Sequence, residues 1–163
     1  MTELLPILRQ QPKLNQSMKT SRIVTIVLAL ACIAGVLFAA PIPGPKGGRI
    51  LTTAAPYAEF FVEKDHTATV TFYDANLKPV APGDQVVSVV AEAKSGKAKL
   101  NFNKTSTGFV SDGKLPKGDD YNIVIQIKDT SAATPKNYRV YFEDEACDKC
   151  HRAQYACICE EKK

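Results

Sequence analysis

Apolar side chains recur at every second position in the segments between Tyr57 and Glu143. This spacing places them on one face of a half-buried β-strand. The predicted inward-facing rows are Ala58, Phe60 and Val62; Ala68, Val70 and Phe72; Val87, Val89 and Ala91; Ala98, Leu100 and Phe102; Tyr121, Ile123, Ile125 and Ile127; and Tyr138, Val140 and Phe142. The polar residues between them are expected to face water, namely Thr67, Thr69, Thr71, Asn122, Gln126 and Arg139.

Clusters of Gly, Pro, Asp and Asn separate these rows at residues 74–76, 82–84, 95–96, 112–113 and 116–120. Such clusters are typical of turns. No comparable stretch after residue 40 has helical periodicity. The pattern therefore predicts an all-β domain over residues 57–143, an antiparallel immunoglobulin-like or related β-sandwich of about seven strands.

The segment Leu115–Tyr121 runs directly into the apolar row that begins at Tyr121. It resembles the tyrosine corner of immunoglobulin-like and fibronectin type III domains, in which the tyrosine hydroxyl bonds back to the upstream backbone. The alternative is a core tyrosine after an ordinary Pro-Gly turn.

Residues 23–40 carry no charge, and Lys19 and Arg22 precede them. This arrangement is typical of a signal peptide or a signal anchor, predicted over residues 18–40 as one N-terminal hydrophobic helix. A spanning helix needs ~20 apolar residues, and this run is close to that length, so its length does not distinguish a cleaved signal peptide from a retained anchor. We expect the rest of the chain in the periplasm, soluble after cleavage or anchored in the inner membrane through residues 23–40.

Two short segments flank this hydrophobic stretch. Residues 1–17 precede the positions where a charged signal-peptide region is expected, so we predict that they are an N-terminal extension and that translation starts at Met18. Residues 41–56 are predicted to form a Pro/Gly-rich spacer and a first strand.

The charge of the chain is concentrated near its N-terminus. The whole sequence has 21 Lys and Arg against 17 Asp and Glu, whereas from Pro41 onward the counts are 17 and 16. Without a basic patch, nucleic acid is not expected as a partner. The sequence also has no paired carboxylates placed for acid–base work, no nucleophile with its base and no phosphate loop, so we do not expect an enzyme.

Four short segments follow one another at spacings associated with a known family: residues 47–50, 57–62, 70–74 and 78–80. Residues 46–143 resemble the periplasmic β-domain of adaptor proteins of cobalt-zinc-cadmium type efflux pumps and of their free-standing relatives. The chain has no room for the helical hairpin and lipoyl-like barrel of those adaptors. The resemblance implies a periplasmic accessory module linked to metal handling, with a protein partner in the cell envelope such as an efflux system.

The Cys-rich tail, residues 144–163, contains four of the five cysteines of the chain, which are Cys147, Cys150, Cys157 and Cys159. Two pairs of thiolates on neighbouring loops suit a tetrahedral metal site. The prediction is zinc first and copper(I) second, and His151 could replace one cysteine.

Three other interpretations of the tail remain open. Two disulfides are expected for cysteines in an oxidising compartment, with nested bridges rather than one within Cys157–Cys159. Cys147, Cys150 and His151 also match the Cys-x-x-Cys-His motif of c-type haem, but the short polar segment that follows supplies neither a helical pocket nor a second axial ligand. Thioredoxin-like redox catalysis would need an α/β fold, which the pattern does not predict.

These observations together predict a non-enzymatic periplasmic or membrane-tethered binding or accessory protein with a C-terminal metal site. The alternatives are a small redox or c-type haem protein and a structural envelope protein with a disulfide-braced tail.

Overall fold

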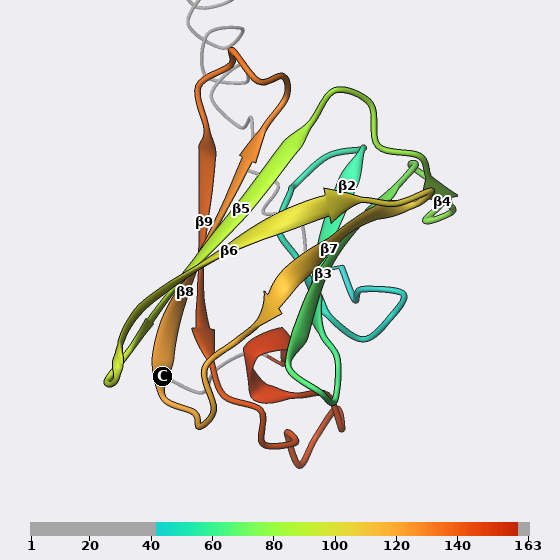
Figure 1. Ribbon diagram of the computed structural model, residues 1–163. Helices are drawn as coiled ribbons and strands as arrows, with labels where there is room; N and C mark the ends of the chain where they lie inside the picture. The colour runs from blue at the N-terminus through green and yellow to red at the C-terminus, as the bar shows by residue number, and fades with distance from the viewer. Residues whose placement is uncertain (1–41, 160–163) are drawn as a thin grey trace, which may run out of the picture. The chain divides into compact units, whose positions relative to one another are not determined.

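The computed structural model describes residues 42–159, and all of them belong to one compact unit of the chain (Figure 1). Nine strands and one short 3₁₀ helix make up the regular structure of this part. Their bounds are β1 (Arg49–Ile50), β2 (Tyr57–Val62), β3 (Thr67–Tyr73), β4 (Pro79–Val80), β5 (Val86–Ala93), β6 (Gly96–Lys104), β7 (Gly108–Lys114), β8 (Tyr121–Lys128), β9 (Lys136–Phe142) and η1 (Gln154–Ala156).

The strands form one antiparallel sheet in the order β1-β2-β3-β7-β6-β5-β8-β9, and β4 pairs with β3 beside this path. The long strand β6 pairs with β5 from Ala93↔Gly96 to Ser88↔Asn101, and then with β7 from Phe102↔Ser111 to Lys104↔Phe109. Because β6 changes partner along its length, the sheet curls and encloses its apolar face. The prediction of an antiparallel all-β fold is confirmed.

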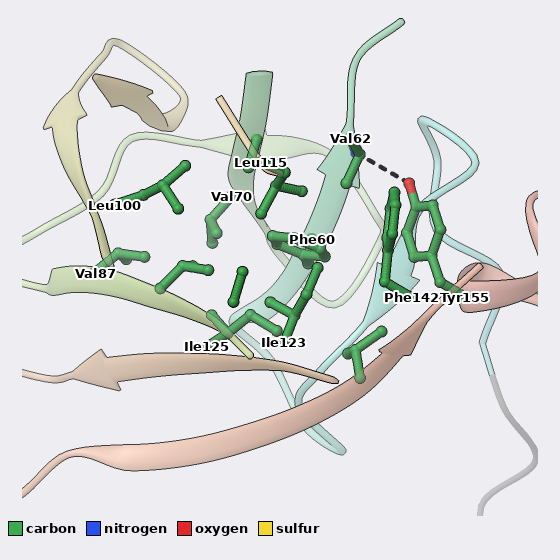
Figure 2. Packing of buried hydrophobic residues seen from close by; sticks show 14 of the residues in the cluster. Phe60, Val62, Val70, Val87, Leu100, Leu115, Ile123, Ile125, Phe142 and Tyr155 are labelled. Carbon is green, nitrogen blue, oxygen red and sulfur yellow. Dashed lines mark hydrogen bonds between the residues drawn. The ribbon is translucent and has the colours of Figure 1, made fainter. Parts of the chain in front are cut away.

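The inner face carries the residues that the period-two pattern selected. Every member of the predicted rows in β2, β3, β5 and β8 is buried, and Ala98, Phe102 and Tyr138 are the members of the other two rows that are only partly buried. Figure 2 shows side chains from both ends of the strand order meeting in one cluster. Alternating apolar residues bury one face of a strand, and this accounts for the agreement.

The strand β7 and the burial of Thr71 depart from the predictions. Asp112 and Gly113 were expected in a turn but lie inside β7, where Asp112 accepts a hydrogen bond from the backbone N–H of Asn101 at 3.2 Å. Thr71 was expected to face water but is 4% exposed, because β3 is covered on both faces near its end. Period-two patterns identify the apolar face of a strand but do not report what covers the polar face.

Glu59 on β2 shows this second kind of burial most clearly. Its carboxylate is 0% exposed and accepts hydrogen bonds from the Tyr73 hydroxyl at 2.6 Å, from the Gly48 N–H at 2.7 Å and from the Lys46 N–H at 3.0 Å. A turn closed by the Gly47 N–H and the Gly44 carbonyl lies over it. Residues 43–48, within the predicted spacer, are therefore held against the domain.

The start of β8 contains the bond expected of a tyrosine corner. The hydroxyl of Tyr121 donates a hydrogen bond to the carbonyl of Pro116 at 3.0 Å, and the ring is buried beside Phe142 with the centroids 5.0 Å apart. Burial, followed by the charges of Asp119 and Asp144, raises the pKa of Tyr121 to about 12.

The predicted N-terminal extension and hydrophobic segment, residues 1–40, lie outside the described residues. Between residues 42 and 159, no helix has the length and apolar character needed to cross a membrane.

Candidate metal centre

The four cysteines of the tail come together in space. The sulfur atoms of Cys147, Cys150, Cys157 and Cys159 all lie within 4.8 Å of one another. The Sγ of Cys157 is 3.5 Å from that of Cys147 and 3.7 Å from that of Cys150. Cys147 is buried, and the other three are partly buried. Such a group could hold a metal ion.

A tight loop positions the first pair of cysteines. The Cys147 N–H donates to the Arg152 carbonyl at 2.7 Å, and the His151 N–H donates to the Cys147 carbonyl at 2.8 Å. His151 closes the loop with a φ of 56°, a left-handed conformation that is uncommon for a residue other than glycine. This reversal of the chain directs both cysteine side chains toward the second pair.

Backbone N–H groups point at the sulfurs. Hydrogen bonds from the N–H groups of Cys150 and then Lys149 lower the pKa of the Cys147 thiol to about 6. Burial, followed by hydrogen bonds with the neighbouring thiols, raises the pKa of Cys159 to about 12. The Cys159 N–H donates to the Cys157 sulfur at 3.4 Å. Cys147 therefore ionises before Cys159, because backbone hydrogen bonds lower the pKa of Cys147 whereas burial raises the pKa of Cys159.

The tail is attached to the core of the domain by Tyr155. This residue lies in η1 between the two cysteine pairs, is 3% exposed, and stacks on Phe142 with ring centroids 5.4 Å apart. Its ring also meets the edge of Phe60 at 6.2 Å, and its hydroxyl accepts a hydrogen bond from the Val62 N–H at 3.0 Å (Figure 2). The cysteine loop and the sheet therefore share one hydrophobic core.

Two arginines join the tail to the first described residues. Arg49 on β1 donates from Nη1 to the Cys157 carbonyl at 3.2 Å, and Arg152 donates from Nη1 to the Gly44 carbonyl at 3.2 Å. Both bonds span 108 positions of sequence. The Arg49 bond holds the second cysteine pair near β1, and the Arg152 bond holds the first cysteine loop near Gly44.

The structure brings together four of the five predicted ligands and leaves out His151. The His151 side chain is exposed and lies outside the group of four sulfurs, because its residue forms the turn of the loop. The expected disulfides are also not found, since Cys147, Cys150, Cys157 and Cys159 are all free thiols in the described part of the chain. Their Sγ separations of 3.5 and 3.7 Å exceed the ~2.0 Å of a disulfide.

Sequence reasoning missed Tyr155, Arg49 and Arg152, which hold the site in place. A large aromatic residue in an otherwise polar tail was the available signal for Tyr155. The two arginine contacts had no local signal, because each joins the tail to a residue near the start of the domain.

Comparison of the chain with family models, with curated proteins and with solved structures gives no match. The chemistry that this chain can perform is therefore inferred from the geometry of the four sulfurs and of the surface around them.

Proposed function

We propose that this chain is a non-enzymatic binding or accessory protein of the cell envelope, whose β-domain docks a partner and whose C-terminal loop holds one zinc ion on four thiolates. The observation that carries the proposal is the clustering of all four tail sulfurs within 4.8 Å. The metal would be structural, because four protein ligands leave no open position for a substrate.

The sulfur spacing is compatible with zinc. A tetrahedron with Zn–S bonds of ~2.3 Å has sulfur–sulfur edges of ~3.8 Å. The separations of Cys157 from Cys147 and from Cys150, 3.5 and 3.7 Å, are close to that length. Four thiolates also bind copper(I) and iron, so copper(I) is the second choice on ligand softness.

The β-domain is proposed to be an immunoglobulin-like sandwich. Two features support this. The strand order has β2-β3-β7 on one side and β6-β5-β8-β9 on the other. The hydroxyl of Tyr121, at the start of the penultimate strand, bonds to the Pro116 carbonyl. Domains of this architecture serve mostly as binding modules, and a fold alone does not define a function.

The envelope location follows from residues 23–40 as a signal peptide or anchor. The resemblance of residues 46–143 to the periplasmic β-domains of efflux adaptors supports a link to metal handling with an efflux system as partner. Docking rather than catalysis is proposed, because the sequence has no set of residues placed for catalysis.

The two rival functions have weaker support. A c-type haem would need Cys147 and Cys150 for its thioether bonds, yet both belong to the four-sulfur group and Cys147 is 7% exposed. A disulfide-braced tail would need sulfurs drawn together from 3.5 Å to bonding distance.

Elemental analysis of the purified full chain tests the proposal. We expect one equivalent of zinc, and we expect cobalt(II) to replace it with the intense visible absorption of tetrahedral thiolate coordination. The Cys157→Ala/Cys159→Ala variant should lose the metal, whereas His151→Ala should keep it because this side chain lies outside the group.

Three outcomes would contradict the proposal. Equal metal content in the parent chain and the double variant would exclude these ligands. A mass that shows two disulfides after thiol alkylation would favour the braced tail, and a Soret band would identify haem.

A further inference from the structure

A groove of about 530 Å³ runs beside the candidate metal centre. Its walls come from opposite ends of the strand order, with Arg49 on β1 and Arg139 to Tyr141 on β9. The tail residues Cys157, Ile158 and Cys159 form a further wall, and Val140 and Tyr155 contribute apolar atoms. The groove therefore marks the place where the two ends of the curled sheet face each other across the metal loop.

The strand β9 presents an open edge at this groove. Within residues 42–159, β9 is the last strand in the sheet order and pairs with β8 alone. An edge strand carries a row of backbone N–H and C=O groups that an extended segment of another protein can pair with. Tyr141 on this strand is 48% exposed, one of two large hydrophobic residues that are exposed in the described part of the chain.

The charges around the groove select the kind of segment that fits. Arg49 and Arg139 line the groove from opposite walls, and Arg139 also forms an ion pair with Glu92 at 3.2 Å. The sequence of β9 contains no acidic residue. Glu143 is the one carboxylate among the described residues that line the groove. Complementary charge favours an acidic strand and disfavours a basic one.

We propose that the groove between β1 and β9 is a docking site for an extended acidic segment of a partner protein, which adds to the sheet along β9. This inference rests on the proposed function, because the loop held by the metal forms one wall of the groove. Tyr141 would contact an apolar side chain of the segment, and Arg49 and Arg139 would pair with its carboxylates.

A second copy of this chain suits the edge less well. Antiparallel pairing of two full-length β9 strands would bring Arg139 of one copy opposite Arg139 of the other. Like charges opposite one another destabilise a strand pair. The positive charge of β9 therefore disfavours pairing with a second copy and favours pairing with an acidic strand.

The test uses the full chain in neutral detergent and two capped eight-residue peptides, one alternating Val with Glu and the other alternating Val with Lys. We expect the Glu peptide to shift the backbone amide resonances of β9, including Arg139 and Tyr141. We expect it to bind at least about tenfold more tightly than the Lys peptide.

A charge reversal in the groove should exchange this preference. The Arg139→Glu variant is expected to bind the Lys peptide better than the Glu peptide. Glu92 is not left unpaired in this variant, because it keeps its ion pair with Lys97 at 2.9 Å. The matched control is Lys99→Glu on β6, an exposed lysine away from the groove, which should leave the preference unchanged. Amide spectra and zinc content verify that both variants are folded.

Three results would overturn the docking site. They are equal affinity for the two peptides, resonance shifts confined to other surfaces, and no shift at about 5 mM peptide, a concentration on the order of the weakest useful affinity. A chain that holds one zinc and ignores the acidic peptide would sink this inference and leave the metal site standing. A chain that lacks zinc and still binds the acidic peptide would contradict the metal site and leave the docking site standing.

Discussion

The hydroxyl of Tyr155 accepts a hydrogen bond from the backbone N–H of Val62, 93 positions earlier in the chain. Val62 is the last residue of β2, and Tyr155 lies between the two cysteine pairs. A single side chain therefore ties the candidate metal loop to the end of a core strand. The stability of the loop and that of the domain are expected to depend on each other.

Replacing Tyr155 by Phe should destabilise the domain by about 1–2 kcal/mol, because the buried N–H of Val62 loses its partner while the ring packing on Phe142 remains. Urea unfolding of the two proteins measures the difference. The control is Tyr57→Phe, whose hydroxyl makes no hydrogen bond to the described residues and whose replacement should change stability by less than about 0.5 kcal/mol. Equal effects of the two replacements would contradict the role given to Tyr155.

Removal of the metal with a chelator should release the tail before it unfolds the sheet. We expect the amide of Val62 to exchange with solvent at least about tenfold faster, since its partner Tyr155 depends on the metal loop for its position. The amides of Ile123 and Ile125, which lie on the buried strand β8, should keep their protection. Hydrogen exchange followed by NMR measures both, and uniform acceleration would show that the metal stabilises the whole domain instead.

The turn over β2 depends on the buried side chain of Glu59. Its replacement by Ala leaves the Tyr73 hydroxyl and the Gly48 N–H without an acceptor, so we expect a loss of about 3 kcal/mol or more. Gln keeps the shape and one carbonyl acceptor and should cost less. Glu63→Ala is the control, because this carboxylate is exposed, and its effect should stay within about 0.5 kcal/mol. A Glu59→Ala variant as stable as the control would show that the turn does not contribute to stability.

Three buried tyrosines, Tyr73, Tyr121 and Tyr155, predict a loss of stability at alkaline pH, because burial is the first cause that raises the pKa of each. Burial is the largest cause that raises the pKa of Tyr155, and of Tyr121, to about 12 in the folded chain. A group whose pKa is raised by folding contributes stability that is complete below its unfolded pKa of ~10 and is lost as the pH rises through the folded value. Urea unfolding should therefore show constant tyrosine-linked stability up to about pH 9 and a decline between about pH 10 and 12.

Tyr155→Phe serves as the control for that decline, because it removes one of the three tyrosines with a raised pKa. The variant should lose less stability than the parent chain over the same interval of pH. Tyrosinate absorbance measured in parallel should rise late for three of the tyrosines. Ionisation of all tyrosines near pH 10, the ordinary value for the phenol, would contradict the assigned burial.

The strand rows and the cysteine spacing could be read from the sequence, because each is a local pattern. Alternation of apolar residues in β2, β3, β5 and β8 identifies the buried face without reference to the rest of the fold. The segment before Tyr121 indicated a tyrosine corner as one of two alternatives, and the structure shows the Tyr121 hydroxyl bonded to the Pro116 carbonyl. The spacing of Cys147, Cys150, Cys157 and Cys159 indicated a candidate metal site, and the structure brings their sulfurs together.

The tertiary structure decided everything that depends on segments far apart in the chain. Glu59 and Thr71 are buried on the faces where alternation places water, because other parts of the chain cover them. Asp112 and Gly113 extend a strand because β6 and β3 are available to pair with it. The tail joins the core through Tyr155 and Ala156 of η1, and His151 is left outside the sulfur group by the turn that it forms. Sequence alone thus determined which residues are apolar and which could bind metal, whereas the burial of polar groups and the docking of the tail required long-range contacts that no local pattern encodes.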